Sequence, residues 1–144
     1  TYGPRQLLRH NRQGFVAWFV RLALEGREIQ VYGDGRQRRD LTYVDDVVDA
    51  IIKAIELPAM NTEINIGTGK ETSVIDVANE IALEIPDMQE WEFVDGRPID
   101  NITRRCLDIK KAEQLLDWSP RVNLREGIKR TIEWLSSIPT TYQK

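Results

Sequence analysis

The chain has 144 residues, of which 41% are hydrophobic and 30% charged, the proportions of an ordinary soluble globular protein. This length predicts one domain that buries about 68–70% of its unfolded surface. The net charge of −3 argues against a general nucleic-acid binder, and no apolar run approaches the roughly 18 residues of a membrane span. A single cysteine, Cys106, and a single histidine exclude an internal disulfide and a common zinc site. With no signal peptide recognisable, the expected location is the cytoplasm.

Charge is distributed unevenly along the chain. Residues 1–40 carry 8 basic and 4 acidic side chains, residues 41–96 carry 2 and 13, and residues 97–144 carry 10 and 6. The two basic segments could converge on one anionic ligand, or they could be solvated faces of separate helices.

The first predicted element is an amphipathic helix over residues 12–25. Asn11 is expected to cap its N-terminus and Gly26 to end it. Its apolar residues recur at intervals of three and four, which indicates one buried helix face. They are Phe15, Trp18, Phe19, Leu22 and Ala23.

Residues 31–46 are the most informative stretch. A short strand around Val31 breaks at Gly33-Asp34-Gly35, where glycine permits positive φ. The next four residues are basic or amide: Arg36, Gln37, Arg38 and Arg39. Residues 41–44 predict a second extended run before a helix starts at Asp45-Asp46. The unit either presents guanidinium groups to a phosphate or is a hairpin with a solvated basic turn.

The remaining elements alternate between helix and strand, which predicts an α/β fold. Helices are expected over residues 46–57, 74–84 and 109–116 and again from residue 124, with strands over residues 63–67 and 91–94. Ser73-x-x-Asp76 and Asn123-x-x-Glu126 are helix-capping patterns. The helix over residues 46–57 is predicted to bury an apolar stripe of Val47, Val48, Ile51, Ile52 and Ile55. No linker is evident, so residues 1–138 are expected to form one domain and residues 139–144 a frayed tail.

Three apparent motifs do not carry chemistry. Gly67-Thr68-Gly69-Lys70 lacks the first glycine and the final Ser/Thr of a phosphate-binding loop. Gly33-Asp34-Gly35 lacks the third glycine of a dinucleotide fingerprint. Asp45-Asp46 is typical of a helix start, where carboxylates complement the helix dipole.

Residues 31–46 resemble the segment YGDGxQxRDxxYVDDV of the extended short-chain dehydrogenase/reductases, the NAD-dependent sugar-nucleotide epimerases, dehydratases and decarboxylases. Shorter family-like pieces lie on both sides of this segment, in the order in which the family has them. They are Tyr2-Gly3-Pro4-Arg5, Leu24-Glu25-Gly26, Asn65-Ile66-Gly67, Arg97-Pro98, Asp108-Ile109-Lys110-Lys111-Ala112, Trp118-Ser119-Pro120 and Glu126-Gly127. The ordered set covers nearly the whole chain. It implies an α/β fold that corresponds to the C-terminal, substrate-binding part of such an enzyme, without most of the Rossmann half.

The resemblance also implies where the chemistry lies. The family's catalysis uses a Tyr-x-x-x-Lys pair with a nearby Ser/Thr, and a Gly-rich loop holds the NAD that transiently oxidises the sugar at C4. No Tyr-x-x-x-Lys pair and no such loop occur in these 144 residues. The resemblance therefore implies no catalytic, cofactor-binding or metal-binding residue here, and these residues alone are expected to be inactive. NAD would be bound mainly by the N-terminal half.

The resemblance assigns five candidate substrate-binding residues. The arginines that match Arg39 and Arg97 contact the diphosphate of the nucleotide sugar, and the positions of Gln30, Val31 and Tyr32 wall the nucleobase. Arg39 could instead form a salt bridge with the acidic residues Asp40 or Asp46. Arg104 and Arg105 are alternatives to Arg97, or are solvated, and Trp118 and Trp134 are expected in the core.

The favoured hypothesis is the nucleotide-sugar-binding portion of a sugar-nucleotide epimerase, UDP-glucose 4-epimerase-like. The alternatives are the same segment of a 4,6-dehydratase or UDP-glucuronate decarboxylase, and a free-standing, non-catalytic nucleotide-sugar-binding module. The expected ligand is a UDP- or dTDP-linked sugar, and the expected partners are an N-terminal Rossmann half and a second copy in a homodimer. Neither a nucleic acid nor a membrane is an expected partner.

Overall fold

The computed structural model describes residues 1–8, 14–58, 61–96 and 102–138. The helices in these ranges are α1 (Phe15–Leu24), α2 (Val44–Glu56), α3 (Val74–Glu84), α4 (Lys110–Leu116) and α5 (Leu124–Ser137). The strands are β1 (Gln30–Tyr32), β2 (Arg38–Arg39), β3 (Thr72–Ser73), β4 (Glu92–Val94) and β5 (Arg104–Arg105). The fold is therefore α/β, and its strands are short. None of the helices in the described ranges is long and apolar enough to cross a membrane.

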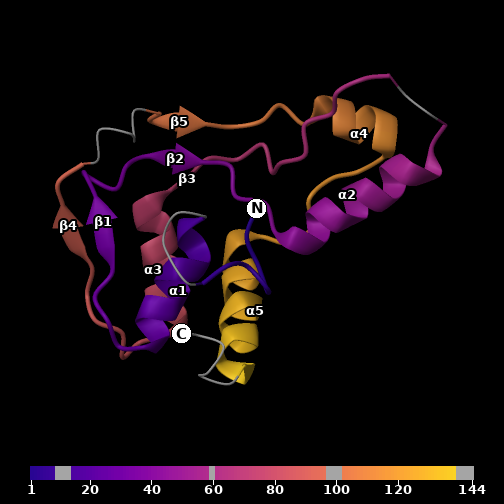
Figure 1. The fold of residues 1–144 in the computed structure, drawn as a ribbon. Coiled ribbons are helices and arrows are strands. Elements are labelled where there is room, and N and C mark those ends of the chain that lie inside the picture. Colours follow the sequence, from indigo (N-terminus) through magenta and orange to yellow (C-terminus); the bar gives the residue numbers. More distant parts are fainter. Residues whose placement is uncertain (9–13, 59–60, 97–101, 139–144) are drawn as a thin grey trace.

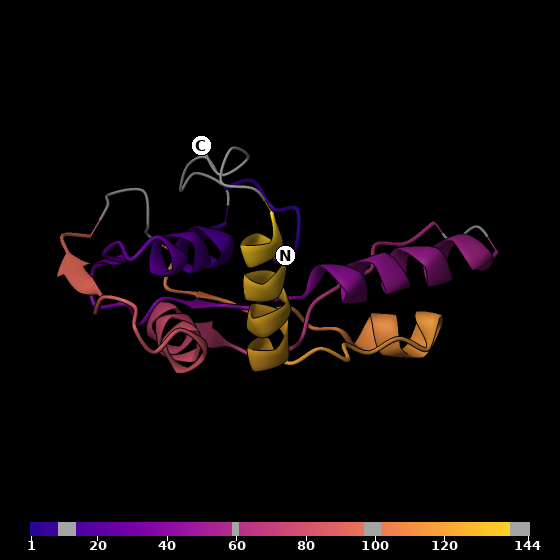
Figure 2. The ribbon, with the colours of Figure 1, turned by 90° about the horizontal axis from the view of Figure 1, so that it is seen from below.

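The main core lies between α1, α3 and α5, which pack against one another below β2 and β5 and to the right of β1 in Figure 1. β1 closes this core on one side, because Val31 and the preceding Ile29 are both fully buried. The pair α2 and α4 extends away from the three helices as a separate arm, as both Figure 1 and Figure 2 show. A second, smaller core fills this arm: Ala50, Ala112, Leu116 and Trp118.

The strands form two small sheets. The hairpin considered for residues 31–46 is therefore not what the structure shows. β1 pairs in parallel with β4, whereas β2 lies between antiparallel β3 and parallel β5. The turn that starts at Gly33 thus carries the chain from one sheet to the other and does not close a hairpin. Residues 41–43 form no strand; Tyr43 makes a single parallel bridge with Tyr2, and α2 begins directly afterwards.

The local capping signals are confirmed. The Ser73 hydroxyl accepts a hydrogen bond from the amide of Asp76 at 3.1 Å, and the Asp76 carboxylate accepts one from the Ser73 amide at 3.0 Å. Asn123 caps α5 by accepting from the Glu126 amide at 3.0 Å. The start predicted for the first helix is wrong, because α1 begins only at Phe15, after Gly14. The expected cap, Asn11, lies outside the described residues.

Helix α2 forms as predicted, but its apolar stripe is not buried. Val48, Ile51, Ile52 and Ile55 are 48%, 53%, 50% and 77% exposed, and the buried residues of the helix are Asp46 and Ala50. The physical reason is that α2 packs against the short helix α4 on its Ala50 side. No other described element covers the stripe.

The strand predicted over residues 63–67 is absent from the described structure. Ile64 and Ile66 pack against the small core of the arm. A strand also needs a neighbour that accepts and donates its backbone hydrogen bonds, and no described segment pairs with these residues. The apolar residues of this segment are therefore packed inward, but the segment has no hydrogen-bonded neighbouring strand in the described structure.

Candidate functional site

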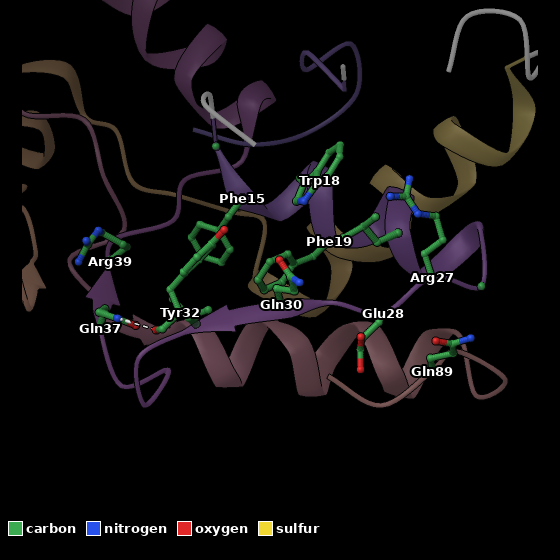
Figure 3. Close-up of a pocket in the computed structure, with 14 residues that line it drawn as sticks. Phe15, Trp18, Phe19, Arg27, Glu28, Gln30, Tyr32, Gln37, Arg39 and Gln89 are labelled. Carbon is green, nitrogen blue, oxygen red and sulfur yellow. Dashed lines mark hydrogen bonds between the residues drawn. The ribbon is translucent and has the colours of Figure 1, made fainter. Parts of the chain in front are cut away.

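A cleft of about 720 Å³ lies between α1 and the strands β1 and β2. The side chains that define it come from these three elements and from the loops beside them. They are Phe15, Trp18, Phe19, Arg27, Glu28, Gln30, Tyr32, Gln37, Arg39 and Gln89. In Figure 3 Arg39 marks one end of the cleft, Arg27, Glu28 and Gln89 mark the other, and aromatic side chains lie between.

Strand β1 builds one wall by alternation. Side chains along a strand point to opposite faces, so Gln30 and Tyr32 line the cleft while Val31 is fully buried in the core behind it. Of the three residues proposed to wall a nucleobase, two therefore reach the cleft. Val31 supports the wall from behind and does not line it.

The glycine turn after β1 sets the position of β2. Gly33 and Gly35 both have φ of +68°, as the glycine-breaking pattern predicted. A Cβ at Gly35 would lie 2.9 Å from Cγ1 of Val31, so the chain can turn this tightly only with glycine. The amide of Gln37 then donates from Nε2 to the carbonyl oxygen of Tyr32 at 2.9 Å, which ties the far side of the turn to β1 (Figure 3).

Helix α1 provides an aromatic wall from the face that the sequence pattern predicts to be buried, and Phe15 and Trp18 on this face also pack against the main core. Phe15 and Trp18 are partly exposed and line the cleft, and Phe15 stacks edge-on against the buried Phe19 with ring centroids 5.3 Å apart. The guanidinium of Arg21 lies 5.7 Å from the centre of the Trp18 ring. A repeat of apolar residues every three or four positions cannot distinguish a core face from a cleft face, because both exclude water from one side of the helix.

Arg39 brings a cation to one end of the cleft, and the alternative of a salt bridge to Asp40 or Asp46 is not what the structure shows. The Asp40 carboxylate accepts hydrogen bonds from the amides of Thr68 and Gly69, at 2.7 and 2.9 Å. The Asp46 carboxylate accepts from two backbone amides of the segment before α5. Arg39 itself donates to the carbonyl oxygen of Arg38 at 2.8 Å, and it forms no ion pair with a described carboxylate.

The opposite end of the cleft is electrostatically different. Arg27 donates to Glu25 at 3.0 Å, and Arg21 donates to the other oxygen of the same carboxylate at 2.7 Å. Burial acts to raise the pKa of Glu25, but the two arginines outweigh it and lower the pKa. Arg27 at this end is thus already ion-paired with Glu25, whereas Arg39 has no described carboxylate partner, which makes Arg39 the better attractor for an anion among the described lining residues.

The other candidate arginines differ in their surroundings. Arg97 lies outside the described residues. Arg104 donates two hydrogen bonds to the carboxylate of Glu71, at 2.8 and 3.0 Å. Arg105 is exposed and follows it in β5.

This arrangement suits recognition of a ligand with a planar ring and an anionic group. The aromatic side chains and the amide of Gln30 can hold a ring by stacking and hydrogen bonding, while Arg39 can donate two parallel hydrogen bonds to a phosphate. Among the described residues no group of three or more His, Cys, Asp or Glu side chains is placed to hold a metal ion.

Comparison with known proteins places these observations in a family. Residues 1–67 match the model of the NAD dependent epimerase/dehydratase family. The UDP-glucose 4-epimerase of Mycolicibacterium smegmatis is 40% identical over 134 residues, a match that covers 93% of this chain and 42% of that protein. Decarboxylases and 4,6-dehydratases of UDP-linked sugars also match.

Solved structures agree with the sequence matches. The UDP-glucose 4-epimerase of Thermotoga maritima, crystallised with UDP-glucose, has a TM-score of 0.87 and 37% identity, covering 94% of this chain and 43% of that one. The NAD complex of the Thermus thermophilus UDP-glucose 4-epimerase has a TM-score of 0.83 and 30% identity, covering 94% and 44%. The chain thus spans about two fifths of the length of these UDP-glucose 4-epimerases.

Proposed function

The chain belongs to the NAD dependent epimerase/dehydratase family, and we propose that it is the nucleotide-sugar-binding portion of a sugar-nucleotide epimerase similar to UDP-glucose 4-epimerases. The observation that carries the proposal is the convergence of Gln30, Tyr32 and Arg39 on one cleft. These three residues come from two different sheets, yet they line the same cavity. A relative of known structure was crystallised with UDP-glucose, which supports a nucleotide sugar as the ligand here.

Each proposed role follows from the place of the residue in the cleft. Arg39 binds the diphosphate, because it combines a guanidinium fork with no competing described carboxylate. Gln30 and Tyr32 hold the nucleobase together with the aromatic side chains of α1. Val31 acts from the core by fixing the strand. Arg97, which lies outside the described residues, stays the second proposed diphosphate ligand.

One candidate cradle for the pyrophosphate of NAD is already occupied. The glycine-containing turn at residues 67–69 offers backbone amides of the kind that hold a pyrophosphate, but the amides of Thr68 and Gly69 already donate to Asp40. We propose that NAD is bound mainly by the N-terminal half of a complete enzyme, and we assign to this portion the recognition of the nucleotide sugar.

The exposed stripe of α2 favours a portion of a larger enzyme over a free-standing binding module. Four branched apolar side chains on one helix face form the kind of surface that soluble proteins cover with another element. The coding DNA upstream of Thr1 tests this choice. We expect about 180 further codons, one domain's worth, that include Gly-x-x-Gly-x-x-Gly and Tyr-x-x-x-Lys; an in-frame stop codon would support the module.

Replacing Arg39 with alanine in the complete enzyme tests the site itself. We expect Arg39→Ala to weaken nucleotide-sugar binding by about 1.5–3 kcal/mol, the contribution of hydrogen bonds to a charged group, without changing the affinity for NAD. Isothermal titration calorimetry with UDP-glucose and with NAD measures both quantities.

The matched control is Arg36→Ala, because Arg36 belongs to the same turn but its side chain is 86% exposed and does not line the cleft. It should bind UDP-glucose like the wild type. An equal loss for NAD and UDP-glucose in Arg39→Ala would contradict the assignment of Arg39 to the diphosphate.

A further inference from the structure

Asp40 directly follows Arg39 at the end of β2, and its carboxylate is surrounded by hydrogen-bond donors. One oxygen, Oδ1, accepts hydrogen bonds from the hydroxyl and the amide of Thr68, the amide at 2.7 Å. The other oxygen, Oδ2, accepts from the amide of Gly69 at 2.9 Å and from the amide of Leu107 at 3.3 Å. Both oxygens are therefore engaged, and their donors come from two segments that are far apart in the chain.

Gly67 lets the chain pass close to this carboxylate. A Cβ at Gly67 would lie 2.8 Å from Oδ2 of Asp40 and 2.9 Å from Cδ1 of Leu107. Both distances are too short for an ordinary contact, so a larger residue would push the carboxylate or the turn at residues 67–69 aside. The glycine thus has a physical role that the proposed function does not use.

The carboxylate lies where the sheet β3-β2-β5 joins the arm of α2 and α4. β2 continues into α2, the chain from α2 enters β3 through residues 67–71, and β5 continues through residues 106–109 into α4 (Figure 1). The amide of Asp40 also donates to the carbonyl oxygen of Arg105 at 2.9 Å. Asp40 therefore holds both neighbours of β2 at the point where the three strands meet the arm.

This anchoring matters for Arg39, because a side chain can be positioned no more firmly than the backbone that carries it. Arg39 lies opposite Thr72 of β3 and opposite Arg105 of β5. The hydrogen bonds to Asp40 fix the chain beside both of these partners. They also occupy the carboxylate, so the guanidinium of Arg39 stays available at the end of the cleft.

We propose that Asp40 is a positioning residue for nucleotide-sugar binding, an inference that rests on the proposed function. By fixing the junction of β2, β3 and β5, its carboxylate holds the guanidinium of Arg39 where the diphosphate binds. Asparagine at position 40 would keep the shape of the side chain but would replace one acceptor oxygen with an NH₂ group. That donor would face the amide of Thr68 or of Gly69, and the turn would move away because two donors cannot share a hydrogen bond.

The variant Asp40→Asn in the complete enzyme tests the proposal, with UDP and uridine as ligands in calorimetric titration. We expect the affinity for UDP to fall about fivefold, less than on removal of the Arg39 guanidinium itself. The affinity for uridine should not change, because uridine has no phosphate. If Asp40 acted only through its charge, removing a negative charge beside an anion site would strengthen UDP binding. Stronger or unchanged UDP binding would therefore overturn the inference, as would an equal loss for uridine.

The matched control is Asp46→Asn, because it makes the same chemical change at a second carboxylate that accepts hydrogen bonds from two backbone amides. Those amides belong to Arg121 and Val122, and Asp46 is not among the described residues that line the cleft. Asp46→Asn should lower the melting temperature but change the affinity for UDP less than about twofold. A loss as large as that of Asp40→Asn would show that general destabilisation weakens binding, and the positioning role would be refuted.

A double-mutant cycle shows whether Asp40 acts through Arg39. Adding Asp40→Asn to Arg39→Gln should change the affinity for UDP less than about twofold, because the group that Asp40 positions is already absent. Losses that multiply in the double variant would mean that the two residues act independently, contrary to the proposal.

The same titrations distinguish failure of this inference from failure of the proposed function. If the wild type binds neither UDP nor UDP-glucose, the proposed function fails and the inference fails with it. If the wild type binds both ligands and Arg39→Gln weakens binding while Asp40→Asn does not, the proposed function survives and only the positioning role is overturned.

A second variant, Gly67→Ala, decides the question if Asp40→Asn does not fold. It keeps every hydrogen-bonding group and displaces the carboxylate of Asp40 by crowding alone. The affinity for UDP should fall in the same direction, again without a change for uridine. Wild-type affinity for UDP in Gly67→Ala would overturn the inference.

Discussion

At the scale of single residues, the carboxylates near the central segment serve backbone amides and not arginines. Asp46 is only 4% exposed and accepts hydrogen bonds from the amides of Arg121 and Val122, each at 3.1 Å. The indole of Trp118 donates to the Asp46 carbonyl oxygen at 3.0 Å, and Trp118 is buried as predicted. The structural interpretation of Asp45-Asp46 is therefore right, but Asp46 secures the chain between α4 and α5 and does not cap its own helix.

We expect Asp46→Ala to lower the free energy of unfolding by about 2–4 kcal/mol, because it leaves two partly buried amides without their acceptor. Asp45→Ala should change it by less than about 0.5 kcal/mol, because Asp45 is 68% exposed and lies 3.9 Å from Arg130. Urea unfolding of the two variants measures the difference. Equal losses would show that Asp46 contributes through helix charge and not through the hydrogen bonds to residues 121 and 122.

At the scale of elements, the sheet β3-β2-β5 is stabilised by a carboxylate from a residue outside its strands. Glu71 precedes β3 and bridges Arg104 and Arg38 across β2 and β5. Because the hydrogen bonds from Arg104 lower the pKa of Glu71 below its ordinary value of 4.5, folding favours the ionised carboxylate. The stabilisation is therefore present above pH 4.5 and is lost as the pH falls through the lower pKa of the folded state.

The variant Glu71→Gln tests this pH dependence. Its melting temperature should lie below that of the wild type at pH 7, and the difference should shrink below pH 4.5 until it disappears in more acidic buffer. Salt should reduce the difference at neutral pH, because the arginines are exposed. Glu90→Gln, at an exposed position, is the control and should follow the wild type at every pH. A difference that persists in acid would mean that the amide substitution acts through packing.

At the scale of the whole molecule, the arm formed by α2 and α4 leaves a stripe of apolar side chains uncovered. Its small core buries Ala50, Leu116 and Trp118, while the stripe of α2 that includes Ile51 and Ile55 faces outward. The residues that were predicted to form a strand, Ile64 and Ile66 among them, lie beside the same arm without a pairing partner in the described structure. An α/β fold leaves an uncovered apolar helix face beside an apolar segment without strand partners where a further layer normally packs.

We therefore expect the 144-residue chain, expressed alone, to self-associate through α2. The double variant Ile51→Glu/Ile55→Glu should reduce the association, measured by sedimentation velocity, without lowering the melting temperature of the isolated chain, because both side chains are more than half exposed. Leu83→Glu on α3, also exposed at 59%, is the control for a single apolar residue elsewhere. A wild-type chain that stays monomeric at high concentration would favour the free-standing module instead.

The sequence by itself determined the elements whose signals are local. The capping box of Ser73 and Asp76, the cap at Asn123 and the glycine turn at 33–35 all depend on residues within four positions of each other. Helix periodicity placed the five helices of the described ranges near their observed positions for the same reason. The family resemblance likewise identified Gln30, Tyr32 and Arg39, which line the cleft.

Only the tertiary structure decided which neighbour each element meets. It showed that the 31–46 segment crosses between two sheets, that Phe15 and Trp18 face a cleft, and that Glu71 neutralises Arg104. Strand pairing and register join residues far apart in the chain, and a shift by one residue reverses every side chain on a strand. The burial of a helix face depends in the same way on what packs against it, which is why the stripe of α2 could be recognised in the sequence while its exposure could not.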